Sequence, residues 1–174
     1  MDAMNDIFKT ISRVLLRTVV IAVSMPAALS IEDAVAQSIC SDINILIEEA
    51  PRDFSGIIVE PSRGSGGYGV TFELEGASDC TVRQLLKGKS YYCTWEFRHR
   101  DAEAYMTYKA LGQDLQSCIG DRAVLSDDQN VNHPDFYESR MFLLDQAKVS
   151  VSVKDKSALG STFIFVSVEP LTGT

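Results

Sequence analysis

Apolar residues recur at intervals of three and four in two parts of the chain, which is the spacing of one face of an α-helix. The first part, residues 41–50, is short and ends before Pro51. The second part, residues 101–118, is longer, and Asp101 stands where an N-cap is expected. The pattern therefore predicts two amphipathic helices, separated by about fifty residues of a different character.

The remaining apolar runs either alternate with polar residues or are short and continuous, as β-strands do. They predict strands at residues 54–60, 68–74, 80–84, 89–97, 136–144, 148–154 and 162–168. A Ser/Gly-rich loop at 61–67 and a polar loop at 125–135 interrupt them. The order of elements predicts an α+β fold with an antiparallel sheet of about six or seven strands. Both helices lie on one face of it, in two helix-plus-meander halves.

Four cysteines fall within this pattern, and the position of two of them follows from the register of a hairpin. If Gln84 pairs with Lys89 across the turn between their strands, Cys80 comes to lie directly opposite Cys93. Directly opposite residues of an antiparallel pair are close enough for a disulfide. We therefore predict a bond between Cys80 and Cys93.

The other two cysteines belong to the helices. Cys40 comes just before the first predicted helix, and Cys118 comes at the end of the second. If the two helices pack antiparallel on one sheet, these ends meet, and Cys40 bonded to Cys118 is the natural second disulfide. Bonds from Cys40 to Cys80 or to Cys93 remain as alternatives at this stage.

The first 36 residues have the three parts of a secretion signal: basic residues, an apolar stretch at 18–29 and small residues before a cleavage site. We expect cleavage before Gln37, with a second candidate site directly after Ser30. The apolar stretch is shorter than the ~20 residues that span a bilayer, which disfavours a retained membrane anchor. The interpretation is a cleaved signal at 1–36 and a single disulfide-bonded domain at 37–174, exported to a bacterial periplasm or secreted.

The chain is acidic, with a formal net charge of −8, and removal of residues 1–36 leaves the remainder near −7. Nucleic acids and anionic membranes attract proteins through basic surfaces. The charge therefore argues against nucleic acid as a partner. We expect another protein of the cell envelope instead, and we expect neither a cofactor nor a metal, because the cysteine spacing is unlike that of zinc sites.

Candidate catalytic residues are few, since the chain contains only two histidines. His133 lies in the polar loop beside Asp135 and near Tyr137, so these three residues are the candidates for a general base and its partners. His99 lies in a charged segment between a strand and a helix, where we expect it to be solvated. Nucleophile, phosphate-binding and redox motifs are missing from the sequence.

The sequence therefore favours a non-enzymatic binding protein, such as an inhibitor, an immunity protein or an accessory factor, whose rigid scaffold presents loops to another protein. The loops at 61–67 and 127–135 are the expected contact surface. The residues expected to bind are Arg63, Tyr68, Asp127, Asp128 and Asp135.

Two alternatives remain open. One is a small hydrolase or lyase centred on His133. The other is a small-molecule carrier that uses the aromatic face of Tyr91 and Trp95. For that face the sequence favours core packing over ligand binding.

Overall fold

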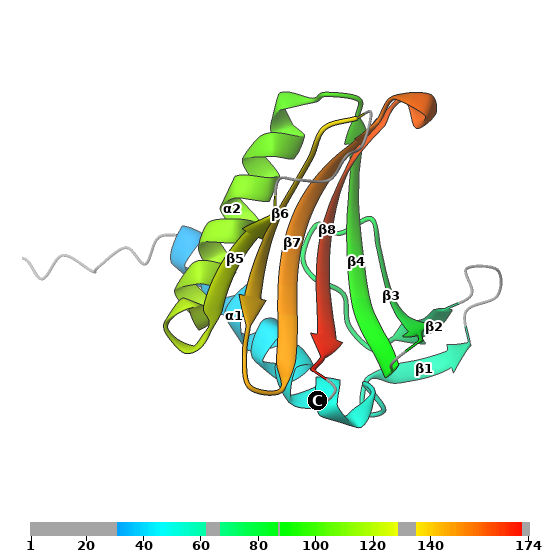
Figure 1. Ribbon diagram of the computed structural model, residues 1–174, viewed down its shortest axis with the longest axis vertical. Coiled ribbons are helices and arrows are strands. Elements are labelled where there is room, and N and C mark those ends of the chain that lie inside the picture. Colours follow the sequence, from blue (N-terminus) through cyan, green and yellow to red (C-terminus); the bar gives the residue numbers. More distant parts are fainter. Residues whose placement is uncertain (1–30, 62–66, 87, 129–134, 172–174) are drawn as a thin grey trace, which may run out of the picture.

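A computed structural model of the chain describes residues 31–61, 67–86, 88–128 and 135–171. Its centre is one antiparallel sheet in which the strands follow the order β1-β2-β3-β4-β8-β7-β6-β5. The strands are β1 (Ile58–Pro61), β2 (Gly67–Val70), β3 (Asp79–Leu85), β4 (Gly88–Arg98), β5 (Val124–Asp128), β6 (Tyr137–Leu143), β7 (Ala147–Lys156) and β8 (Ser161–Pro170). Helix α1 (Ile31–Glu49) precedes the first four strands, and α2 (Ala102–Ile119) precedes the last four (Figure 1).

The fold is thus the predicted α+β arrangement of two helix-plus-meander halves, and β4 and β8 join the halves at the centre of the sheet. The described strands number eight rather than six or seven. The additional strand is β5, which occupies the first part of the predicted polar loop at 125–135. Its residues pair with β6 from Val124 opposite Leu143 to Asp128 opposite Ser139. An edge strand is held by backbone hydrogen bonds and needs no apolar side chains. The polar sequence of β5 therefore gave no pattern from which a strand could be predicted.

Both helices pack on the same face of the sheet, as predicted. Strand β7 shows why, because its residues are alternately buried and half-buried along its whole length. The buried members Val149, Val151 and Val153 are fully inaccessible to solvent and share a cluster with Leu46 of α1 and Leu115 of α2. Burial of such side chains is the main source of stability for a two-layer fold.

Both predicted disulfides are present. Cys80 lies opposite Cys93 with Cα atoms 4.1 Å apart, in the predicted register of Gln84 opposite Lys89. Cys40 is bonded to Cys118, which excludes the alternative pairings of Cys40. The described cysteines include no free thiol, and this pattern is typical of proteins that mature in an oxidising compartment.

Three elements differ in extent from the prediction by four residues or more. Strand β1 begins at Ile58 instead of at residue 54. Helix α1 begins at Ile31, ten positions before the expected start, so Cys40 lies inside the helix and the cleavage expected before Gln37 falls within it. Strand β2 ends at Val70 instead of continuing to residue 74, and the amide of Thr71 donates to the carbonyl of Ile57. No helix in the described ranges is both long enough and apolar enough to cross a membrane.

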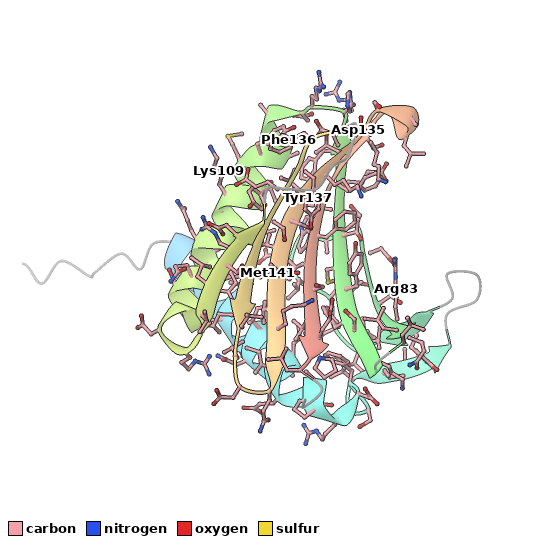
Figure 2. The ribbon with its side chains drawn as sticks, in the orientation of Figure 1. Arg83, Lys109, Asp135, Phe136, Tyr137 and Met141 are labelled. Carbon is pink, nitrogen blue, oxygen red and sulfur yellow. A yellow bond between two sulfur atoms is a disulfide. The ribbon has the colours of Figure 1, made fainter. Side chains whose placement is uncertain are left out.

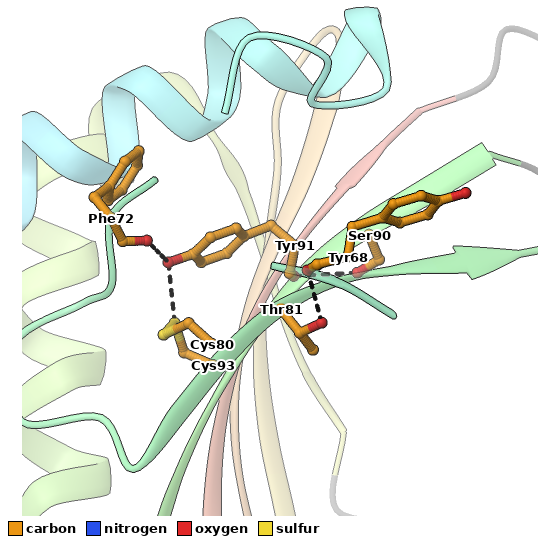
Figure 3. Close-up of a disulfide and its surroundings, with 7 residues drawn as sticks. All are labelled: Tyr68, Phe72, Cys80, Thr81, Ser90, Tyr91 and Cys93. Carbon is orange, nitrogen blue, oxygen red and sulfur yellow. Dashed lines mark hydrogen bonds between the residues drawn. A yellow bond between two sulfur atoms is a disulfide. The ribbon is translucent and has the colours of Figure 1, made fainter. Parts of the chain in front are cut away.

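Behind the Cys80–Cys93 bond lies Tyr91, one of the largest fully buried side chains of the core. Its hydroxyl donates to the carbonyl oxygen of Phe72 at 3.3 Å and lies 3.1 Å from Cys93 Sγ (Figure 3). Burial raises the pKa of the Tyr91 hydroxyl far above its usual value. Tyr91 and Trp95 both belong to the hydrophobic core, as the sequence favoured.

Candidate binding face

The second face of the sheet, which we call the open face, is the one opposite α1 and α2. In the view of Figure 1 the strands run in front of the helices. The register places on this face every second residue of the central strands, including Tyr92 of β4 opposite Ser167 of β8, and Ser150 of β7 opposite the same serine. Among the described elements, both helices belong to the other layer. Neither described helix therefore covers the open face.

Aromatic residues form a row on the open face where the two halves of the sheet meet. The rings of Tyr92 and Phe165 lie 5.1 Å apart, and those of Phe165 and Phe163 are stacked at 5.9 Å. The guanidinium of Arg83 lies over the Tyr92 ring at 4.7 Å. All three rings are half-buried. Burial raises the pKa of Tyr92 to about 12, against a smaller opposing effect of Arg83.

A stripe of serines from β8, β7 and β6 runs beside this row. Ser150 and Ser167 share a hydrogen bond of 2.8 Å between their hydroxyl oxygens, and Ser139 lies opposite Ser152. Ser139 and Ser167 are only 5% and 6% exposed. These short side chains are therefore mostly buried between the larger side chains of the open face.

Tyr137 and Met141 of β6, which Figure 2 labels, lie on the same face, on either side of Ser139. The ammonium group of Lys154 lies 5.8 Å from the centre of the Tyr137 ring, within the range of a cation–π contact. Asp135, immediately before β6, accepts a hydrogen bond of 2.7 Å from the Ser157 hydroxyl.

The charge of the open face differs from that of the whole chain. In strands β3 to β8 the register places on it the basic residues Arg83, Arg98, Lys148, Lys154 and Lys156, and the acidic residues Asp79, Glu96, Asp128 and Glu169. Basic side chains outnumber acidic ones here, in a chain with a net charge of −8. The excess acidity is therefore carried by the rest of the molecule.

The structure divides the predicted binding residues between the two faces. Asp128 lies on the open face, opposite Ser139. Asp127 points to the helix-covered side and forms an ion pair of 3.2 Å with Arg140. Tyr68, at the edge of the sheet, lies opposite Val82 of the core, and the Lys89 ammonium lies 4.7 Å from the centre of its ring. Arg63 lies outside the described residues.

The predicted catalytic residues are not assembled into a described site. His133 lies outside the described residues, so the hypothesis that centres on it stays a prediction. Its two candidate partners, Asp135 and Tyr137, contact Ser157 and Lys154 respectively. Within the described ranges, no group of three or more His, Cys, Asp or Glu residues could hold a metal ion.

A second polar cluster lies at the opposite face, where β7 meets α2, and sequence analysis missed it. The carboxylate of Asp155 is 1% exposed and accepts hydrogen bonds from the Tyr105 hydroxyl at 3.0 Å and the Thr162 hydroxyl at 2.7 Å. The guanidinium of Arg100 lies 3.5 Å away. Burial, followed by the hydrogen bond to Asp155, raises the pKa of Tyr105. Because the carboxylate is fully hydrogen-bonded, the cluster is a structural anchor.

His99 also differs from its expected solvated state. His99 is half-buried, and its Nε2 atom is buried without a hydrogen-bond partner among the described residues. The adjacent Arg100 has a φ of 59°, an uncommon value for a residue other than glycine. The turn between β4 and α2 is thus more constrained than its charged sequence indicates.

The pockets lined by described residues include two that contain neither Asp135 nor Tyr137. One, of about 370 Å³, lies at the end of the sheet between Asp53, Asp145 and Leu171. The other, of about 190 Å³, lies between α2 and β6 and is lined by Tyr108, Glu138 and other residues. Both are shallow depressions, unlike the enclosed apolar cavity that a small-molecule carrier requires.

Comparison with protein-family models, with curated proteins and with solved structures finds no match for this chain. A proposal about its function is therefore based on the fold and on the open face.

Proposed function

We propose that the chain is an exported, non-enzymatic protein-binding module of the bacterial cell envelope, and that its contact surface is the open face of the sheet. The observation that carries this proposal is the row of half-buried rings formed by Tyr92, Phe163 and Phe165 on a face that neither described helix covers. Aromatic residues and arginine are enriched at the centres of protein interfaces. The Arg83 guanidinium stacked on Tyr92 belongs to the same pattern.

The scaffold suits this role because it is rigid. One disulfide joins two strands, and the other joins the two helices that back the sheet. A preorganised surface loses less conformational entropy on binding than a flexible one. The disulfides also support maturation in an oxidising compartment, and the predicted signal at 1–36 supports the periplasm as that compartment.

The proposal modifies the contact surface expected from the sequence. Asp128 of the predicted loop at 127–135 lies on the open face, and Asp135 precedes the open-face residue Tyr137. Asp128 lies in line with Phe165 of the aromatic row, with Ser139 of β6 and Ser152 of β7 between them. Asp127 contributes instead to the opposite side.

The proposal can be tested with a photo-crosslinking amino acid placed at one of two methionines. Met141 lies on the open face, and Met106 lies on α2 with 64% of its surface exposed. We expect irradiation of cells that produce the full chain to yield a defined protein adduct from position 141, repeated from position 163. Position 106 is the matched control and is expected to yield none.

Adducts that form equally from 106 and 141, or from neither, would contradict the proposal. An adduct to a nucleic acid instead of a protein would exclude a protein partner for this face. Because both positions carry the same probe, differences in probe chemistry do not affect the comparison.

A further inference from the structure

Two lysines occupy neighbouring positions at one end of the open face. Lys154 and Lys156 are two residues apart on β7, so both side chains point to the same side of the sheet. Lys154 lies between Tyr137 on β6 and Phe163 on β8, and Lys156 lies opposite Ser161. Both lysines are half-buried.

Among the described residues, the salt bridges of the basic neighbours of these two lysines are not matched by one to Lys154 or Lys156. Lys148, on the same strand, forms an ion pair of 2.9 Å with Glu169, and Arg98 lies 3.9 Å from Asp101. In the part of the chain that the structure describes, neither Lys154 nor Lys156 forms such a pair. Two like charges thus lie close together, and the carboxylate of Asp135 offsets their repulsion only in part, because the pKa of Lys154 is still lowered.

Their surroundings make this arrangement unfavourable in the free protein. Burial is the main cause of the lowered pKa of Lys154, and the nearby ammonium of Lys156 lowers it further. Asp135 acts in the opposite direction, but its carboxylate already accepts a hydrogen bond from Ser157. A second anion placed between the two ammonium groups would relieve their repulsion.

We propose that Lys154 and Lys156 form an anion subsite of the open face, which takes a carboxylate group from an acidic segment of the partner protein. This inference rests on the proposed function and specifies the chemistry of the partner. The rings of Tyr137 and Phe163 flank the subsite, so the segment also presents apolar groups. Long polyanions are repelled by the net charge of −8, whereas a single acidic segment needs only local complementarity.

The direct test is titration of the full chain with an eight-residue peptide that alternates glutamate with phenylalanine. NMR signals of the lysine side chains report the site. We expect the signals of Lys154 and Lys156 to shift while that of Lys109, on α2, stays in place. We also expect the double variant Lys154→Gln, Lys156→Gln to bind the peptide at least tenfold more weakly than the unaltered chain. The matched control Lys109→Gln removes one exposed charge from the opposite layer and is expected to bind normally.

Three results would overturn the inference: no shift of Lys154 or Lys156, equal binding by the double variant, or equal binding of a peptide with glutamine in place of glutamate. Inorganic phosphate that displaces the peptide completely at equal concentration would show a general anion site and would also overturn the assignment to carboxylate. If the double variant still forms the crosslinked adduct from position 141, the open face binds its partner without this subsite. In that case only the present inference fails, whereas loss of position-specific adducts from the unaltered chain removes the proposed function itself.

Discussion

Cys40 of α1 is bonded to Cys118 in the last turn of α2, with Cα atoms 5.2 Å apart and 78 residues of sequence separation. The bond connects the helix of the first half to the helix of the second. It therefore holds together the layer that supports the open face. A crosslink over so long a loop strongly restricts the unfolded chain.

Replacement of Cys40 and Cys118 by alanine is accordingly expected to lower the free energy of unfolding by about 4 kcal/mol, the loop-entropy value for this separation. Urea unfolding monitored by the fluorescence of Trp95, the single tryptophan of the chain, measures it. The fold should persist, because the core between helices and sheet is unchanged. A loss below about 1 kcal/mol would show that the unfolded chain is already constrained there.

The anchor around Asp155 gives a second prediction. Tyr105→Phe removes one hydroxyl that donates to the buried carboxylate. Hydrogen bonds to charged groups contribute about 1.5–3 kcal/mol, so we expect a loss near 1.5 kcal/mol because Tyr105 is only half-buried. In an Asp155→Asn background the same substitution should cost clearly less. Equal losses in the two backgrounds, measured by urea unfolding, would disprove the coupling.

Tyr92 predicts a dependence on alkaline pH. Its pKa in the folded chain is about 12, above the ordinary value of 10, because burial disfavours the phenolate. Between these two values the unfolded chain loses the Tyr92 proton while the folded chain keeps it. Stability should therefore fall as pH rises from about 10 to about 12. Tyr92→Phe is expected to make this fall less steep in urea unfolding at several pH values, and an identical slope would refute the assignment.

The sequence predicted those features that depend on periodicity or on register. The alternation around Val149 and Val151 indicated the covered face of β7, and the pairing of Gln84 with Lys89 fixed the Cys80–Cys93 bond. Strand β5 was missed because its pairing with β6 uses backbone atoms, which carry no sequence signal at an edge.

The candidate site was harder to predict, because it depends on contacts between distant segments. Phe163 and Phe165 lie in the predicted strand at 162–168, but their exposure depends on which face of the sheet the described helices cover. The burial of Asp155 depends on Tyr105, fifty positions earlier. A contact between two single residues such as these leaves no periodic pattern in the sequence.

The predicted signal gives a fourth test. Cleavage before Gln37 would leave a chain of residues 37–174, whereas cleavage after Ser30 would retain the whole of α1. The intact mass of the protein recovered from the periplasm, with disulfides formed, distinguishes the two. We expect the mass of 37–174. The mass of 31–174 would show that the complete helix belongs to the mature domain, and recovery of the full-length chain in the membrane fraction would refute cleavage.

Asp127 and Asp128 provide the last prediction, because adjacent residues of a strand point to opposite faces. Asp127 pairs with Arg140 on the helix-covered side, and Asp128 lies on the open face. Asp127→Asn should therefore lower stability by less than about 1 kcal/mol, as for other partly exposed ion pairs, and leave binding of the glutamate–phenylalanine peptide unchanged. Asp128→Asn removes a negative charge from the face that receives an acidic segment, so peptide affinity should rise modestly.

Both variants lose one negative charge, so a change in net charge alone affects them equally. The difference between them thus reports which side of the sheet meets the peptide. If Asp127→Asn weakened binding while Asp128→Asn had no effect, the contact surface would lie on the side of α2 and β6. The loop at 127–135 would then bind its partner independently of the open face.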